Sequence, residues 1–124
     1  MNTRYILLAE DDEDLREVMR CQLEEDGMSV READSGLDLL DLLTRGERFD
    51  LVVTDIRMPW MSGLHVATAV RRKGFDVPFI IMTAFADDEL RRTVYEMKNA
   101  VFLEKPFELS LFALAVHDAL AITP

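Results

Sequence analysis

The chain has 124 residues, a length typical of one domain, and its 24 acidic and 14 basic side chains give a formal net charge of −10. A hydrophobic content of 49% is enough for a core and excludes general disorder, while the acid excess argues against direct nucleic-acid binding. No apolar run approaches the roughly 20 residues of a membrane span, and the one cysteine, Cys21, excludes a disulfide framework. We therefore expect a single globular domain over 1–124, located in the cytoplasm and without a membrane segment.

Five short apolar runs predict the strands of a sheet, and the intervals between them leave room for helices. In chain order the runs cover 5–9, 28–31, 51–54, 77–82 and 100–103. The run 28–31 alternates apolar and polar residues, which is typical of an edge strand. The other runs are continuously apolar, as strands covered on both faces are.

Five amphipathic stretches predict helices after these strands. Their apolar stripes are Leu15/Val18/Met19/Leu23, Leu39/Leu40/Leu43, Leu64/Ala67/Val70, Leu90/Val94/Met97 and Leu111/Phe112/Ala115/Val116/Ala119. We expect Asp12 or Glu13 to cap the first helix and Ser35 to cap the second, because polar side-chain oxygens accept hydrogen bonds from free N–H groups. Glycines at 27, 46 and 74 are expected to end the first three. Cys21 lies beside the first stripe and is interpreted as packing.

This alternation predicts an α/β domain with a mainly parallel sheet and helices on both faces. Ligands bind such sheets outside the carboxyl ends of the strands, so chemistry should follow each strand. Glu10 and Asp11 follow the first run, Asp55 follows the third, Thr83 the fourth, and Lys105 the fifth. One edge of the sheet should therefore gather three carboxylates, a hydroxyl and an ammonium.

This set of side chains favours phosphoryl-transfer chemistry assisted by a metal ion. Closely packed carboxylates are costly unless a cation joins them. Oxygen ligands without histidine or cysteine select Mg²⁺, which keeps several waters. A metal with open positions beside a lysine and a threonine suits phosphoryl transfer, and Asp55 is best placed to be the nucleophile that forms an aspartyl phosphate.

Four segments at these strand ends resemble the receiver domain of two-component response regulators. They are 6–12 (ILLAEDD), 55–63 (DIRMPWMSG), 80–84 (IIMTA) and 102–107 (FLEKPF). The resemblance extends over essentially the whole chain. It implies a flavodoxin-like (βα)5 fold, with a five-stranded parallel sheet of order 2-1-3-4-5, and a receiver domain over 1–124 with no effector domain.

The resemblance also implies a role for each residue of the predicted site. Asp55 would accept a phosphoryl group from a sensor histidine kinase or a phosphotransfer protein. Glu10, Asp11, Asp55 and the backbone carbonyl of Arg57 would contact Mg²⁺, and Lys105 would pair with the phosphoryl oxygens. The domain would catalyse only its own phosphotransfer and dephosphorylation, so we do not expect a conventional enzyme.

Two further residues would carry the signal outward. Thr83 would hydrogen-bond to the phosphoryl group, and Phe102 would turn inward when Thr83 moves. An output partner or effector domain would then bind the face built from the fourth helix, the fifth strand and the fifth helix, and this face could also serve a homodimer. The Lys105–Pro106 peptide would be cis.

The sequence departs from the family at a few positions. The first acid is Glu10 rather than the commoner aspartate, so it would reach the metal through water. Lys98 and Asn99 stand where Gly-Ala is frequent, and Phe102 lacks a tyrosine hydroxyl. In the family, the residues two past the aspartate and the threonine line the path of the hydrolytic water; here they are Arg57 and Phe85. We expect the bulk of Phe85 to hinder that water.

Three alternative functions for such a fold require other residues at the strand ends. A receiver-like module that binds partners without phosphate would keep the fold, but such modules usually lose an acid or the lysine. A flavodoxin-like electron carrier needs a loop rich in Ser, Thr or Gly after the first strand, where this chain has acids at 10–14. An aspartate-nucleophile phosphatase needs an Asp-x-Asp pair, which Asp55-Ile56-Arg57 lacks.

Trp60 is predicted to be an exposed loop residue near the site.

Overall fold

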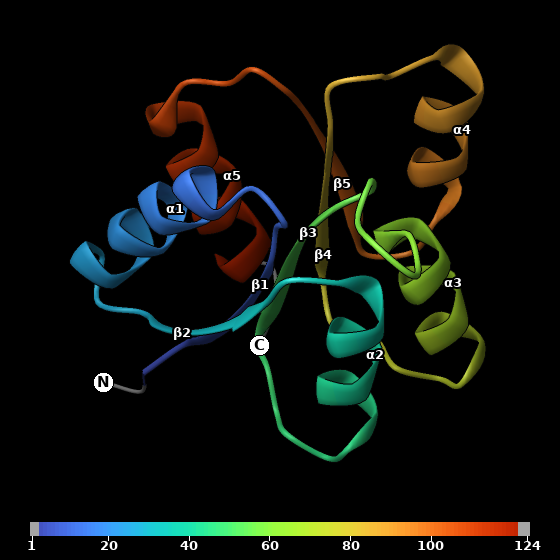
Figure 1. Ribbon diagram of the computed structural model, residues 1–124, viewed down its shortest axis with the longest axis horizontal. Coiled ribbons are helices and arrows are strands. Elements are labelled where there is room, and N and C mark those ends of the chain that lie inside the picture. The colour runs from blue at the N-terminus through green and yellow to red at the C-terminus, as the bar shows by residue number, and fades with distance from the viewer. Residues whose placement is uncertain (1–2, 122–124) are drawn as a thin grey trace.

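The computed structural model describes residues 3–121, and five strands alternate with five helices along them (Figure 1). The strands are β1 (Tyr5–Ala9), β2 (Ser29–Ala33), β3 (Leu51–Asp55), β4 (Phe79–Thr83) and β5 (Ala100–Glu104). The helices are α1 (Glu13–Glu25), α2 (Gly36–Thr44), α3 (Gly63–Arg72), α4 (Asp88–Glu96) and α5 (Leu109–Ala121). All ten predicted elements are confirmed; positions 1–2 and 122–124 of the predicted domain lie outside the described residues.

The sheet is parallel throughout and its strand order is β2-β1-β3-β4-β5, as the resemblance implied. Its two faces are covered by different helices: α1 and α5 lie on one face, and α2, α3 and α4 lie on the other (Figure 1). β3 and β4 are buried along their whole length, whereas β2 and β5 are the partly exposed edges. The continuous apolar runs therefore marked the central strands β1, β3 and β4 correctly, but the prediction that β5 is covered on both faces is wrong, because β5 is an edge strand and Val101 is 47% exposed.

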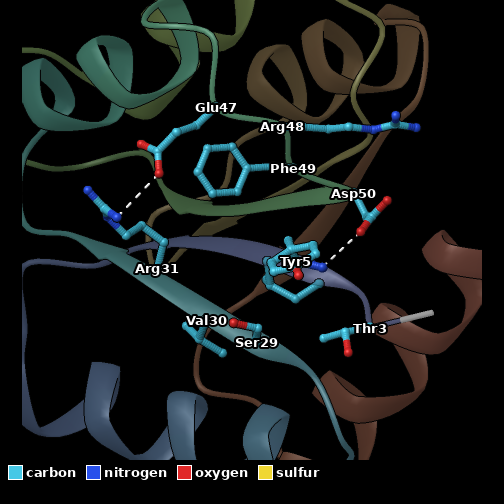
Figure 2. Close-up of a pocket in the computed structure, with 10 residues that line it drawn as sticks. Thr3, Tyr5, Ser29, Val30, Arg31, Glu47, Arg48, Phe49 and Asp50 are labelled. Carbon is cyan, nitrogen blue, oxygen red and sulfur yellow. Dashed lines mark hydrogen bonds and ion pairs between the residues drawn. The ribbon is translucent and has the colours of Figure 1, made fainter. Parts of the chain in front are cut away.

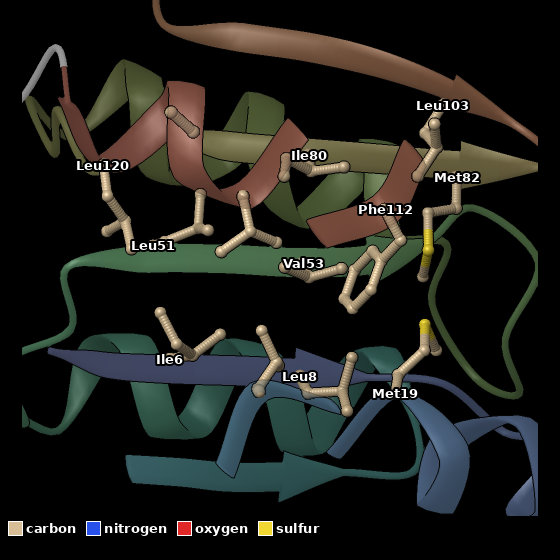
Figure 3. Close-up of a cluster of buried hydrophobic side chains, with 13 residues drawn as sticks. Ile6, Leu8, Met19, Leu51, Val53, Ile80, Met82, Leu103, Phe112 and Leu120 are labelled. Atoms are coloured by element: carbon tan, nitrogen blue, oxygen red, sulfur yellow. The ribbon is translucent and has the colours of Figure 1, made fainter. Parts of the chain in front are cut away.

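Successive residues along each strand pack alternately into two separate hydrophobic cores, one on each face of the sheet. Ile6, Leu8, Val53 and Ile80 pack with Phe112 and the rest of the first core beneath α1 and α5 (Figure 3). On the opposite face the second core holds Leu7, Val52, Ile81, Leu39, Val66 and Val94 beneath α2, α3 and α4. Each core fixes one face of every strand, so the carboxyl ends are held level with one another at one edge of the sheet.

The predicted helix boundaries agree closely with the structure. The carboxylate of Asp12 accepts a hydrogen bond from the Leu15 N–H at 3.1 Å, and the Ser35 hydroxyl accepts one from the Asp38 N–H at 3.1 Å. Glycines 27, 46 and 74 all have positive φ values beyond the ends of α1, α2 and α3. α4 ends at Glu96, and Asn99 takes a left-handed φ of 55° in the turn that replaces the family's Gly-Ala.

Four further details of the sequence interpretation are wrong. β4 begins at Phe79 rather than at position 77, because Pro78 has no N–H to donate to a neighbouring strand. Cys21 is exposed, so it is not packing in the core. Val18 and Leu111 are also about half exposed, since the apolar stripes of α1 and α5 are wider than the surface that meets the sheet.

Within residues 3–121, no helix is long and apolar enough to cross a membrane.

Candidate functional site

Three carboxylates meet at the carboxyl edge of the sheet. β1 and β3 are neighbours in register, with Ala9 opposite Thr54, so the residues after β1 lie beside the end of β3. Glu10, Asp11 and Asp55 each offer an oxygen, and these oxygens all lie within 4.8 Å of one another. Glu10 is 1% exposed and Asp55 is 6% exposed, whereas Asp11 is open to solvent. The predicted acidic cluster is therefore assembled.

Lys105 reaches two of these carboxylates from the segment after β5. Its Nζ lies 2.7 Å from Glu10 Oε1 and 2.9 Å from Asp55 Oδ2. The Lys105 N–H donates to the carbonyl of Thr83 at 2.8 Å, which continues the β4–β5 pairing to the site. The Lys105–Pro106 peptide is cis, as predicted. One ammonium thus neutralises part of a buried acid pair that would otherwise repel itself.

Burial dominates the electrostatics of the site. It raises the pKa of Glu10 from 4.5 to about 7, although the hydrogen bonds from Lys105 and from the Asp12 N–H oppose the change. The negative charge of Asp55 adds to the upward shift. Burial acts to lower the pKa of Lys105, but the hydrogen bonds to Glu10 and Asp55 outweigh it, so that pKa is raised. The raised pKa of Glu10 therefore reflects a carboxyl group held out of water, whereas the raised pKa of Lys105 reflects an ammonium stabilised by two carboxylates.

The remaining predicted residues surround Asp55. Thr83 ends β4, is buried, and its hydroxyl accepts a hydrogen bond from the Phe85 N–H at 3.1 Å. The Arg57 N–H donates to Asp55 Oδ1 at 3.4 Å, so the chain after Asp55 folds back on its carboxylate. Phe102 is half-buried against the second core. The metal contact of the Arg57 carbonyl and the movements of Thr83 and Phe102 stay predictions.

Two contacts at the site were not predicted from the sequence. The Arg57 guanidinium lies over the Phe85 ring at 4.2 Å from its centroid, which joins the two positions expected to line the water path. Arg16 Nη1 donates to the backbone carbonyl of Glu10 at 2.7 Å. The first contact could have been suspected, since both residues follow neighbouring strands. The second carries no sequence signal, because its acceptor is a carbonyl that every residue possesses.

Space beside the acids is available for a ligand. A groove of about 440 Å³ is lined by Asp11, Ile56, Arg57, Met58, Pro59 and Ser62. A larger groove of about 640 Å³ lies at the opposite, amino end of the sheet, where Arg31, Arg48, Phe49 and Asp50 line it with Tyr5 (Figure 2). None of the predicted site residues lines this second groove.

The family follows from a comparison with known proteins. A profile of the response regulator receiver domain matches residues 6–117, which includes every predicted site residue. The chain belongs to this family. Receiver domains act in the phosphorelays of two-component systems, with histidine kinases and output domains, so this receiver domain has a role in phosphorelay signalling.

Individual relatives and structures agree with this assignment. The receiver domain is 31% identical to a cyclic di-GMP phosphodiesterase of Thermotoga maritima over 115 residues, covering 93% of the chain and 30% of that protein. It is 36% identical to response regulator MprA of a Mycobacterium species over 104 residues, covering 84% of the chain and 45% of MprA. The chain therefore spans less than half the length of these curated relatives. The unphosphorylated HemR receiver domain of Leptospira biflexa superposes with a TM-score of 0.90 at 35% identity, over 98% of both chains.

Proposed function

We propose that this receiver domain is a Mg²⁺-dependent phosphoacceptor whose nucleophile is Asp55. The observation that carries the proposal is the Asp55 carboxylate itself, which is buried, bonded to Lys105 at 2.9 Å and clustered with Glu10 and Asp11. An Asp55 oxygen attacks the phosphorus of a phosphohistidine on a histidine kinase or phosphotransfer protein. A P–O bond forms, the P–N bond breaks, and its electron pair stays on the imidazole nitrogen, which takes up a proton.

The donor set fits magnesium. Glu10, Asp11 and Asp55 supply only oxygen, and Asp11 and the adjoining groove leave room for the waters that Mg²⁺ retains. These residues, with the Arg57 carbonyl, would hold the ion, which when bound neutralises charge on the phosphoryl oxygens. Lys105 supplies the second positive charge and is already directed at Asp55. The domain catalyses only its own phosphorylation and dephosphorylation.

The proposed output runs from Thr83 to the α4–β5–α5 face. Thr83 leaves its bond with the Phe85 N–H to contact the phosphoryl group, and Phe102 turns into the space that Thr83 vacates. A pocket of about 390 Å³ adjoins Phe102 between α4 and β5. Exposed Tyr95 and Val101 lie beside this pocket, so a change in Phe102 alters a surface that an output partner or a second copy can contact. A cytoplasmic location is part of the same proposal.

The experiment is phosphate incorporation from acetyl phosphate, measured by intact-protein mass spectrometry with Mg²⁺ and with excess chelator. We expect one phosphoryl group per chain with Mg²⁺ and none with chelator. Asp55→Asn removes the nucleophile at constant shape and should abolish incorporation. Asp118→Asn, on the exposed side of α5, is the matched control and should incorporate normally. Equal incorporation in Asp55→Asn and the wild type would overturn the assignment of Asp55 as the nucleophile, and no incorporation in the wild type with Mg²⁺ would favour a module that works without phosphate.

A further inference from the structure

Arg16 of α1 links the acidic loop to the neighbouring strand. Its Nη1 donates to the Glu10 carbonyl at 2.7 Å, and its Nε lies 3.4 Å from a carboxylate oxygen of Glu32 on β2. The Arg16 side chain is only 17% exposed. The N–H of Glu10 is held as well, because it donates to the Ala33 carbonyl at 3.2 Å. The backbone of Glu10 is therefore tied on both sides.

The bonded carbonyl belongs to the peptide that joins Glu10 to Asp11. The orientation of that peptide sets the direction in which the next side chain leaves the backbone. The Glu10 carboxylate has its own partners, Lys105 and the Asp12 N–H. Among residues 3–121, by contrast, no side chain or backbone N–H hydrogen-bonds to the Asp11 carboxylate, so its direction is set by its own side-chain torsions and by the backbone before it, which Arg16 holds.

We propose that Arg16 is a positioning residue for the metal site: it holds the Glu10–Asp11 peptide so that the Asp11 carboxylate points at the ion. The inference rests on the proposed function, because it concerns the Mg²⁺ that this function needs. Groups that orient metal ligands typically change metal affinity by about ten- to a hundredfold when they are removed.

The charge of Arg16 acts in the opposite direction. A guanidinium near a cation site repels the cation, so loss of its charge alone would tighten Mg²⁺ binding. Loss of the bond to the Glu10 carbonyl would weaken binding. The two effects differ in sign, so the direction of the change in affinity reveals which of them Arg16 exerts.

Arg20 provides a matched control on the same helix. Its Nε lies 3.3 Å from the same Glu32 oxygen, but its other ion pairs are with Glu17 and Glu24 rather than with the acidic loop. Arg16→Met and Arg20→Met therefore remove the same charge and the same ion-pair partner. Only Arg16→Met removes the hydrogen bond to Glu10.

Mg²⁺ affinity is measured by calorimetry and by fluorescence of Trp60, the one tryptophan, which lies in the loop between β3 and α3. We expect Arg16→Met to weaken binding about tenfold and Arg20→Met to leave it unchanged or tighter. Arg16→Lys keeps the charge without the forked donor and should also weaken binding, which keeps the test usable if Arg16→Met does not fold. Urea unfolding without Mg²⁺ confirms that each variant is folded.

Unchanged or tighter Mg²⁺ binding in folded Arg16→Met and Arg16→Lys would overturn the inference while leaving the proposed function intact. Equal weakening in Arg16→Met and Arg20→Met would also overturn it, because the shared Glu32 pair would then be responsible. Failure of the wild type itself to bind Mg²⁺ would instead refute the proposed function.

Discussion

Arg57 and Phe85 lie just beyond the ends of β3 and β4, close to Asp55, the proposed phosphoacceptor. Each is anchored by its own backbone N–H, Arg57 to Asp55 and Phe85 to Thr83, and their side chains meet as a cation–π pair at 4.2 Å. The pair spans the ends of β3 and β4, where a hydrolytic water would approach Asp55. Phe85 is 64% exposed, so its ring is held by the contact with Arg57 rather than by core packing.

We expect Phe85→Ala to shorten the lifetime of phosphorylated Asp55. Loss of the ring opens the water path and removes a contact that stabilises exposed pairs by about 0.5–1 kcal/mol, so hydrolysis should accelerate by about two- to fivefold. Phe85→Leu separates the two contributions, since leucine keeps apolar bulk but has no ring. A normal lifetime in Phe85→Leu would assign the effect to bulk, and a shortened one to the contact with Arg57. An unchanged rate in Phe85→Ala would refute the steric hypothesis.

At this scale the sequence predicted which polar residues come together better than it predicted the orientation of side chains. Glu10, Asp55 and Lys105 could be predicted because each follows a strand and parallel strands end at one edge. The role of Arg16 could not, because a bond from a guanidinium to a backbone carbonyl depends on the path of a loop. Likewise, nothing in the sequence pattern places Trp60 in a left-handed conformation, with φ of 74°.

Among the elements, α3 has the tightest junction with the site. The helix begins at Gly63, and a methyl group on that residue would lie 2.1 Å from the carbonyl oxygen of Asp55 and 2.6 Å from the Thr54 hydroxyl. The Gly63 N–H donates to the Ile56 carbonyl at 3.0 Å, which draws α3 against the end of β3. Any side chain at position 63 would therefore have to push on β3 at its end, where Asp55 lies.

Gly63→Ala should lower the free energy of unfolding in urea by about 1–3 kcal/mol, the usual range for overpacking against neighbours that cannot move away. Ser62→Ala is the control at the same helix end, because it removes only the cap that accepts the His65 N–H and should cost about 1 kcal/mol. We also expect Gly63→Ala to slow phosphorylation at saturating Mg²⁺, whereas Ser62→Ala should not. Equal stability of Gly63→Ala and the wild type would show that α3 can shift away from β3.

Element boundaries were predictable wherever a local signal marks them. Asp12 and Ser35 cap their helices because each offers an oxygen to an N–H three residues later, a short-range rule visible in sequence. The exposure of Val18 and Leu111 was not predictable in the same way. A helix with apolar residues around much of its circumference does not reveal which part of it meets the sheet.

For the whole molecule, strand order was the step that periodicity could not supply. The alternation of strands and helices predicts a parallel sheet with two covered faces, but many orders satisfy it. The order 2-1-3-4-5 came from the resemblance, and it is this order that places β1 beside β3 and so brings Glu10 and Asp11 to Asp55. The net charge of −10 is likewise uninformative until three acids are placed at one edge.

The buried acid pair makes the stability of the metal-free domain depend on pH. The pKa of Glu10 is 4.5 in its ordinary state and about 7 in the folded protein, so the folded state holds this proton more tightly. The resulting stabilisation is complete below about pH 4.5 and is lost as the pH rises through about 7, by an amount on the order of 3 kcal/mol at most. Mg²⁺ needs ionised carboxylates and stabilises only the folded state, so it should restore most stability where Glu10 is ionised.

Melting temperatures measured at about pH 5.5 and about pH 8, with Mg²⁺ or with chelator, test this coupling. We expect Mg²⁺ to raise the melting temperature clearly more at the higher pH, because at the lower pH the ion must displace a proton from Glu10. Glu10→Gln carries no titrating group at that position, so its increment from Mg²⁺ should be smaller and similar at both pH values. An increment in the wild type that is equal at both pH values would mean that Glu10 is already ionised throughout, with Lys105 rather than burial deciding its charge.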